Sequence, residues 1–348
     1  MVTRHRATLL GITASLVLTA ILIARFSDAP SAQASAQADA TARIVTAAQA
    51  VIGSVDAAAR AKLVYPFDSP QKTNWSNLPS GIYQRNSLKM GDLTASQQAT
   101  VMKLLAVALS ADGYRKAVDV MNGDEVLRKG ATAGRGPAFG KDEFFIAFIG
   151  TPSTTTPWML QFGGHHLAIN LTMAGSQATM TPSLPAAQPA TFTWEGRTVR
   201  PLGDENDKGF ALISALDDKQ KAQAILNYRV ADLVLGPTQD GKTIQPEGIR
   251  ASALSAAQQT MLWDIVHEWS GISADAFANA RMTELKSHLN DTYFAWSGPT
   301  TNGSVMYYRI QGPTLVIEYA PQKSVDHIHT IYRDPTNDYG VKIARLRP

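Results

Sequence analysis

The sequence predicts a mixed α+β protein that forms one compact, two-lobed domain. Three segments begin with the same helix-start pattern, and two of them lead into helix pairs that strand-like aromatic segments follow. No solvated linker of the kind that separates independent domains lies between these two halves. The 348 residues suffice for one large domain, which we place at residues 35–348.

The N-terminal segment, residues 1–34, is typical of an export signal. A basic start, Arg4 and Arg6, precedes an uncharged apolar run over residues 9–24, and small residues at cleavage spacing follow, as in Ala32-Gln33-Ala34. These sites lie about ten residues beyond the apolar run, so an uncleaved membrane anchor is the alternative. We therefore expect an exported protein, periplasmic or extracellular, whose only membrane contact is that anchor if it is retained.

The composition excludes several classes of function. The absence of cysteine removes disulfides, zinc–thiolate sites, iron–sulfur clusters and thiol nucleophiles. Removal of residues 1–34 takes away three arginines and one aspartate, which lowers the formal charge from +3 to +1. The chain also lacks a block of five or six like charges, so we expect no nucleic-acid partner.

Capping patterns predict the helices. Thr94, Asp217 and Ser255 are N-cap residues, and a glutamine follows each of them three residues later, as in a capping box. The first helix is expected to end near residue 110 and the third near residue 269, and a second helix follows each, over 111–126 and 274–289.

The segments after the helix pairs predict strands. Residues 158–162 and 306–310 are apolar and aromatic, and turns at Gly163-Gly164 and Gly312-Pro313 reverse the chain into a second strand in each half. Residues 174–202, rich in Pro, Thr, Ala and Gln, predict a long connection with one short strand near 191–200.

The two halves, 93–171 and 254–319, match as an internal pseudo-repeat of helix, helix, strand and hairpin strand. From Gly150 and Gly298 onward the matching positions keep a constant offset along the chain, as far as Asn170 and Glu318. The alternative is that two unrelated α+β modules share short sequence patterns that are common in proteins. A true repeat would place Asn170 and Glu318 at equivalent positions.

Two histidine pairs, His165-His166 and His327-x-His329, are the most unusual feature of the chain. Residues two apart in a strand project from the same face, so His327 and His329 can present their imidazoles to one metal ion. The same rule, applied to a strand over 164–171, places His166 on the face of Asn170 and His165 on the core face. We therefore expect His166 to be a ligand, and His165 to be a fourth ligand, a hydrogen-bonded core histidine or a hairpin-edge residue.

A carboxylate and several arginines accompany the histidines. Glu318 shares the strand face that corresponds to His166, and three imidazoles with one carboxylate and one open position suit zinc, copper or non-haem iron. Glu318 and Arg333 are the candidate catalytic residues, with Arg333 holding or polarising an anionic group. The candidate substrate-binding residues are Arg309, Asn170, Trp158 and Tyr307.

Structural roles are the alternative for these residues. Arg309 and Arg333 can pair with Glu318, Asp334 or Asp338 as satisfied scaffold charges. Asp334 and Asp338 can also orient imidazoles through the ring nitrogen that does not bind a metal. The histidine pairs themselves can be exposed strand residues or a hairpin corner.

Two boxes carry a resemblance to a known family. They read Trp158-x-x-Gln161-Phe162-Gly163-Gly164-His165-His166-Leu167-x-x-Asn170 and His327-x-His329-x-x-x-Arg333-Asp334-Pro335-x-Asn337-Asp338-Tyr339-Gly340. Together they resemble an uncharacterised, mostly bacterial family, domain of unknown function 3500. The resemblance implies one domain over most of the mature chain and supports the choice of histidines, and it implies no reaction.

The sequence thus indicates an exported protein that binds a divalent transition metal through a histidine cluster. We expect a metal-dependent hydrolase that acts on a small-molecule or anionic substrate. The alternative is a metal- or small-ligand-binding module without turnover, whose pocket is lined by Trp158, Tyr307, Tyr308 and Tyr319.

Overall fold

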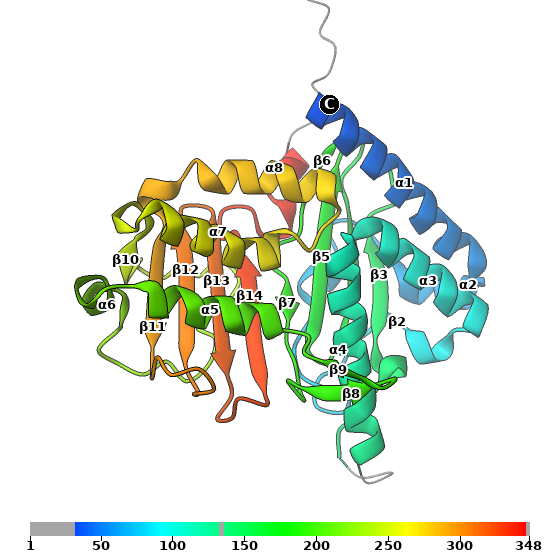
Figure 1. Cartoon of the computed structure of the whole chain (residues 1–348). Helices are drawn as coiled ribbons and strands as arrows, with labels where there is room; N and C mark the ends of the chain where they lie inside the picture. Colours follow the sequence, from blue (N-terminus) through cyan, green and yellow to red (C-terminus); the bar gives the residue numbers. More distant parts are fainter. Residues whose placement is uncertain (1–31, 132–135, 346–348) are drawn as a thin grey trace, which may run out of the picture.

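Two large β-sheets, each with helices packed on one face, form the main body of the computed structural model, which describes residues 32–131 and 136–345 (Figure 1). The predicted mixed α+β class is confirmed. The helices are α1 (Ala32–Ser54), α2 (Ala57–Leu63), α3 (Ala95–Ala108), α4 (Ala111–Gly130), α5 (Gly203–Ala215), α6 (Asp218–Ala224), α7 (Ala256–Ser270) and α8 (Asp275–Lys286).

The strands fall into a seven-stranded, a five-stranded and a two-stranded sheet. In chain order they are β1 (Val64–Tyr65), β2 (Leu88–Lys89), β3 (Phe145–Ile149), β4 (Trp158–Gly164), β5 (Leu167–Ala174), β6 (Gln177–Thr179), β7 (Leu184–Pro185), β8 (Phe192–Trp194), β9 (Arg197–Val199), β10 (Ile249–Arg250), β11 (Tyr293–Ser297), β12 (Tyr307–Gly312), β13 (Leu315–Pro321) and β14 (Ile328–Arg333).

The capping boxes predicted for three helices are confirmed. Thr94, Asp217 and Ser255 each accept the backbone N–H three residues ahead, and the glutamine at that position bonds back to the N-cap N–H. These reciprocal bonds satisfy amide donors that a helix start otherwise leaves without a partner. Helix α6 is only seven residues long, whereas α3 and α7 end within two residues of the expected positions.

Helix α1 is an element that the sequence analysis did not predict. Its buried residues, such as Ala40, Ile44, Ala48 and Val51, recur at three- and four-residue spacing and form one face of the helix. This face belongs to the core of the first half together with residues of α3, including Leu104. The candidate cleavage site at 32–34 therefore lies in the first turn of α1, ahead of its buried residues.

The first sheet runs in the order β1-β3-β4-β5-β6, with β2 beside β3 and β7 beside β5. Strands β4 and β5 form a hairpin that closes at the pair Gly164 and Leu167, so His165 and His166 are its two turn residues. The expectation that the strand begins at 164 and carries both histidines on opposite faces is therefore wrong. His166 has a φ of 62°, a left-handed conformation that ends one strand and reverses the chain.

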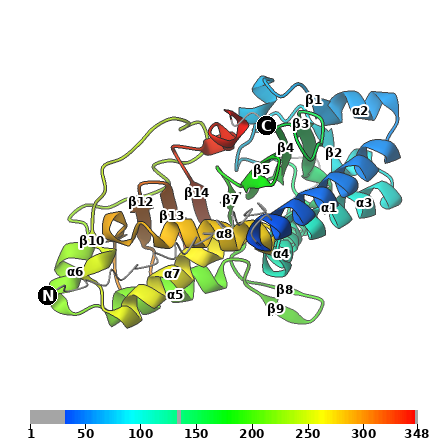
Figure 2. The same cartoon turned by 90° about the horizontal axis from the view of Figure 1, so that it is seen from above.

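The second sheet has the order β10-β11-β12-β13-β14, and all its neighbours are antiparallel. Helices α5, α7 and α8 lie along one side of it, and the connection from α6 to β10 runs along the other side (Figure 2). We call this connection, residues 226–248, the strap. Thr330 of β14 accepts a hydrogen bond from Trp269 of α7, so the alternate residues His329, Ile331 and Arg333 face away from the helices.

A short segment around β7 joins the two sheets. Leu184 and Pro185 pair with β5, and backbone bridges join Ser183 to Tyr332 and Ala187 to Ile328 of β14. The amide of Ala186 donates to the carbonyl of His166 at 2.8 Å. The segment therefore places the hairpin turn of the first sheet beside the start of β14, although the two are about 160 residues apart in the chain.

The connection between the halves holds more strand than expected. Besides β6 and β7, residues 192–194 and 197–199 pair as a hairpin, where the sequence predicted one short strand. A two-residue turn at Glu195 and Gly196, both with positive φ, splits that segment.

The two halves share an order of elements, although the structure does not confirm a duplication. In each half a short strand precedes two helices, and three antiparallel strands follow, β3-β4-β5 in one half and β11-β12-β13 in the other. The pseudo-repeat therefore stays a prediction.

The N-terminal apolar run at 9–24 lies outside the described residues. Within residues 32–131 and 136–345, no helix has both the length and the apolar character needed to cross a membrane.

Candidate metal centre

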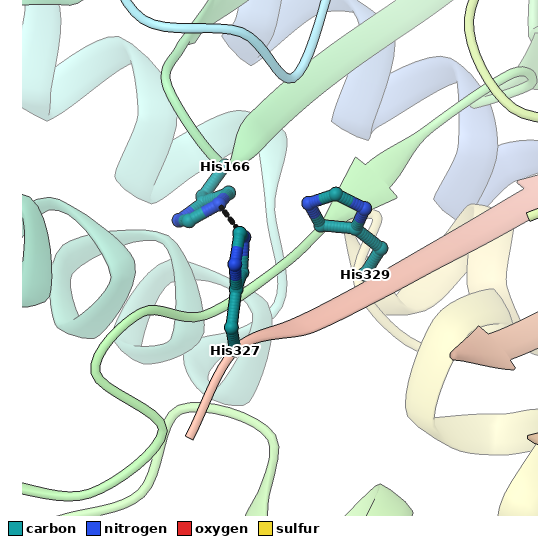
Figure 3. Close-up of side chains that lie close together, drawn as sticks. All are labelled: His166, His327 and His329. Atoms are coloured by element: carbon teal, nitrogen blue, oxygen red, sulfur yellow. Dashed lines mark hydrogen bonds between the residues drawn. The ribbon is translucent and has the colours of Figure 1, made fainter. Parts of the chain in front are cut away.

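Three histidines from two distant segments meet beside the join between the sheets. His166 comes from the β4–β5 turn, His327 lies just before β14, and His329 lies on β14 (Figure 3). One ring nitrogen from each lies within 4.8 Å of those of the other two. His166 and His329 are buried, at 2% and 8% exposure, whereas His327 is partly exposed.

The spacing of the ring nitrogens fits a shared ion. The Nε2 atoms of His166 and His327 are 3.0 Å apart. Two nitrogens bound to one tetrahedral zinc at 2.0–2.1 Å lie about 3.3 Å from each other, so a small shift of the side chains suffices. The set consists of nitrogen donors only, which suits zinc, copper or iron and excludes none of the three.

Burial keeps two of these imidazoles neutral. It lowers the pKa of His166 well below its usual value, and the neighbouring His165, His329 and His327 lower it further. Burial also lowers the pKa of His327 to about 4, and His329 and His165 act in the same direction. A metal binds the neutral imidazole, so protons compete weakly for these two ligands at neutral pH.

A carboxylate and an amide contact the third histidine. Oδ1 of Asp232, on the strap, lies 3.2 Å from Nδ1 of His329. The side-chain nitrogen of Asn77, on the connection between β1 and β2, lies 3.4 Å from Nδ1 and 3.3 Å from Nε2 of the same ring. A carboxylate at Nδ1 fixes the orientation of the imidazole, which is the usual environment of a metal-binding histidine, and a metal at Nε2 would take the place of the Asn77 contact there.

His165 stands behind the three histidines rather than among them. Its ring stacks on that of His166 at 3.5 Å between centroids, and its Nδ1 lies 2.6 Å from Oδ1 of the buried Asp124. The other oxygen of Asp124 accepts the amide of Gly140 at 2.8 Å. This environment corresponds to the hydrogen-bonded core histidine that the sequence left as an alternative to a fourth ligand.

Glu318 faces the same side of the second sheet as His329, but its carboxylate binds other groups. It accepts the hydroxyl of Tyr307 at 2.6 Å and the strap amides of Val234 and Leu235 at 2.9 and 2.7 Å. Burial raises its pKa, and these three hydrogen bonds oppose the shift. Glu318 and Tyr307 therefore fasten the strap to the sheet.

Arg333 and Arg309 also hold the strap. Arg333 is 1% exposed and donates to the carbonyls of Leu235 and Gly236, to Asp240 and to Asp338. Arg309 pairs with Glu247 at 2.8 Å. The scaffold pairing expected between Arg333 and Asp338 is confirmed, and Arg309 takes a strap carboxylate instead of those considered. Catalytic roles for Glu318 and Arg333 stay predictions.

The remaining candidates do not converge on one pocket. Asn170 bonds to Gln161 and to the carbonyl of Pro182, and Trp158 packs on Phe148 in the core of the first half. Tyr308 and Tyr319 stack on each other at 5.0 Å in the core of the second half. The pocket expected from Trp158, Tyr307, Tyr308 and Tyr319 is therefore wrong, because these rings belong to different cores and faces.

Sequence reasoning missed the polar partners of the histidines. Asp232, Asn77 and Asp124 come from a strap, a loop and a helix that lie far from the histidine boxes in the chain. No local spacing relates them to an imidazole. Asp334 and Asp338, which the sequence offered for this role, bond instead to Thr336 and to Arg333.

Comparisons with known proteins place the chain in a family without a described activity. The family model described as "Protein of unknown function (DUF3500)" matches residues 37–341. Searches of curated proteins and of solved structures found no match.

Proposed function

The chain belongs to the DUF3500 family, whose description names no activity, and from the geometry of its site we propose that it binds one divalent transition metal through His166, His327 and His329. The observation that carries the proposal is the convergence of these three imidazoles. Two segments about 160 residues apart deliver nitrogens within 4.8 Å of one another at a partly buried point. Buried imidazoles in contact are costly unless a proton or a metal lies between them.

Hydrolysis is the reaction that this donor set supports best. A metal with three histidine ligands supplies a Lewis acid and lowers the pKa of a bound water. His166 and His327 would hold the ion, and Asp232 would keep Nε2 of His329 directed at it. The partly exposed His327 leaves the solvent side of the site for a small-molecule or anionic substrate.

A metal analysis of protein purified without an affinity tag tests the proposal. We expect about one metal per chain in the wild type and a loss of at least tenfold in affinity in His166→Ala and His327→Ala. His288→Ala is the matched control, because His288 lies two residues beyond the end of α8 and pairs with Glu284. A wild type that binds no zinc, copper or iron, or variants that keep wild-type affinity, would refute the metal centre.

A metal-binding module without turnover is the second candidate. The observation that favours it is that Glu318 and Arg333 are already engaged by the strap, so few side chains are free to act on a substrate. Turnover assays on ester, phosphate and peptide substrates, with and without a chelator, separate the two candidates. Chelator-sensitive hydrolysis supports the enzyme, and its absence with full metal occupancy supports the binding module.

We also propose export. It is supported by the basic start and apolar run within residues 1–34, and by the buried face of α1, which begins at Ala40. Cleavage after residue 34 thus removes none of the buried residues of that helix. Mass spectrometry of the protein's N-terminus, in soluble and membrane fractions, distinguishes cleavage from a retained anchor and from a chain that stays in the cell.

A further inference from the structure

A polar cluster lies behind the metal centre and contacts both connections that reach His329; two of its members are buried and the third is partly exposed. We define it as Arg333, Asp240 and Tyr339 and call it the hub. Oδ1 of Asp240 accepts from Nη1 of Arg333 at 3.0 Å and from the hydroxyl of Tyr339 at 2.8 Å. The hub lies on the sheet face of His329, because Arg333 follows it by four residues on β14, or about 13 Å.

The hub holds the strap. Asp240 is itself a strap residue, and Arg333 donates to the strap carbonyls of Leu235 and Gly236 at 2.7 and 2.9 Å. Three residues before Leu235, the strap presents Asp232 to Nδ1 of His329. Glu318 fixes the segment between them through the amides of Val234 and Leu235.

The hub also holds the β1–β2 connection. The indole N–H of Trp75 donates to the hydroxyl of Tyr339 at 2.8 Å. Two residues later, this connection presents Asn77 to His329. Trp75, Ile331 and Tyr339 belong to one apolar cluster on this side of the sheets, and Leu233 of the strap packs against it. The hydroxyl of Tyr339 therefore bonds to both connections, as does the imidazole of His329 that they reach.

We infer that the hub is a positioning element of the metal centre, in which Tyr339 sets the place of Asp232 and Asn77 around His329. The inference rests on the proposed metal site and adds residues that do not touch the ion. A carboxylate that orients a metal-binding imidazole typically contributes 10- to 100-fold to metal affinity. The hydroxyl of Tyr339 should contribute less than Asp232, because it acts through the backbone of two loops.

The experiment measures the affinity for Zn²⁺ by competition with a chelator, and the visible absorption of the Co²⁺ form. We expect Asp232→Asn to weaken Zn²⁺ binding about tenfold and Tyr339→Phe about three- to tenfold, with a changed Co²⁺ spectrum in both. Tyr228→Phe is the matched control, since its hydroxyl bonds to Glu247 at the other end of the strap. It should keep the wild-type affinity and spectrum.

A comparison in a double-mutant background shows whether Tyr339 acts through the strap and the β1–β2 connection. In an Asp232→Asn, Asn77→Ala background, adding Tyr339→Phe should change the Zn²⁺ affinity by less than twofold. The inference is overturned if Tyr339→Phe weakens Zn²⁺ binding as much in that background as it does in the wild type. It is also overturned if Tyr339→Phe alone keeps the wild-type affinity while Asp232→Asn loses affinity.

Two further outcomes keep the result unambiguous. If Tyr339→Phe does not fold, Asp240→Ala removes the acceptor of the Tyr339 hydroxyl at a side chain that is 32% exposed, and it should weaken Zn²⁺ binding by a similar factor. A wild-type chain that binds neither Zn²⁺ nor Co²⁺ refutes the metal centre itself, and the inference with it. If the wild type binds Zn²⁺ but Tyr339→Phe binds it equally well, the inference about the hub fails and the proposed metal centre stands.

Discussion

His166 combines two properties that ordinary folding does not favour in one residue. Its ring is almost fully buried among other imidazoles, and its backbone has a φ of 62°. A left-handed backbone costs a residue with a side chain about 1–2 kcal/mol relative to glycine, and such strain concentrates at functional sites. A glycine at this position would adopt the turn without this cost, so the Cβ that carries the imidazole is the source of the strain.

This strain predicts the order of stability of two truncations. In metal-free protein, His166→Gly and His166→Ala lose the same ring contacts, but only glycine adopts the left-handed conformation freely. We expect His166→Gly to be more stable than His166→Ala by about 1 kcal/mol in urea unfolding, the reverse of the usual order of these two residues. If the alanine variant is as stable as the glycine variant, or more stable, the turn is not strained.

The neutral imidazoles predict how metal-free protein responds to acid. The pKa of His327 is about 4 when folded, and that of His166 is also depressed, whereas both return to about 6.5 on unfolding. Below pH 6.5 the unfolded chain therefore binds protons that the folded chain does not, and the unfolding free energy falls as pH falls toward 4.

Urea unfolding at pH 7 and pH 5 measures this loss. The decrease should be smaller in His327→Ala than in the wild type, since the variant lacks one of the two groups. His288→Ala is the matched control, because it removes a partly exposed histidine beyond the end of α8 and leaves His166 and His327 in place. Equal decreases in all three proteins would mean that the buried imidazoles do not govern the acid response.

At the scale of elements, the strap is irregular chain held by buried side chains of the sheet. Glu318 accepts three hydrogen bonds, two of them from strap amides, and is fully buried. Glu318→Gln replaces one acceptor oxygen with an NH₂ group, so at least one donor loses its partner. An unsatisfied buried donor costs about 1–3 kcal/mol.

We therefore expect Glu318→Gln to lower the unfolding free energy by about 1–3 kcal/mol and to speed proteolytic cleavage within the strap. Urea unfolding and limited proteolysis with mapping of the first cut measure the two effects. Glu247→Gln is the matched control, because Glu247 lies near the end of the strap and its side chain is 39% exposed, whereas Glu318 is fully buried, so its change should be smaller. If the first cut in Glu318→Gln lies outside the strap, Glu318 does not stabilise the strap.

The elements differ in how far sequence alone predicts them. Helices α3 and α7 were predicted because Thr94 and Ser255 begin capping boxes that act over three residues. The histidine pairs were found because their spacing is local. The strap and its contacts with Glu318 and Arg333 could not be predicted, because residues 226–248 have no periodic pattern and their partners lie up to 98 residues away.

At the scale of the whole molecule, the two halves are joined by a close backbone contact between the start of α4 and the α7–α8 corner. The amide of Ser110 donates to the carbonyl of Ile272 at 3.0 Å, and its hydroxyl donates to the carbonyl of Gly271 at 2.6 Å. Near this joint, a Cβ added to Gly113 of α4 would lie 2.2 Å from the carbonyl oxygen of Ile272. Only a glycine lets α4 approach the α7–α8 corner this closely.

Gly113→Ala therefore tests whether the halves form one cooperative unit. Alanine normally favours a helix by about 1 kcal/mol over glycine, but here it must displace a backbone that accepts the Ser110 hydrogen bond. We expect a net loss of about 1–3 kcal/mol in unfolding free energy. Gly130→Ala, at the end of the same helix, has open space at its Cβ and should be neutral or stabilising.

The probes for this test come from both halves. Trp158 lies in the first core and Trp269 and Trp296 lie in the second, so tryptophan fluorescence and far-ultraviolet circular dichroism together report on the whole fold. One cooperative unit requires that both signals change in a single transition and that Gly113→Ala shifts them equally. Two transitions, of which the variant shifts only one, would mean that the halves fold independently. In that case the metal centre, whose ligands come from both halves, would form only after they dock.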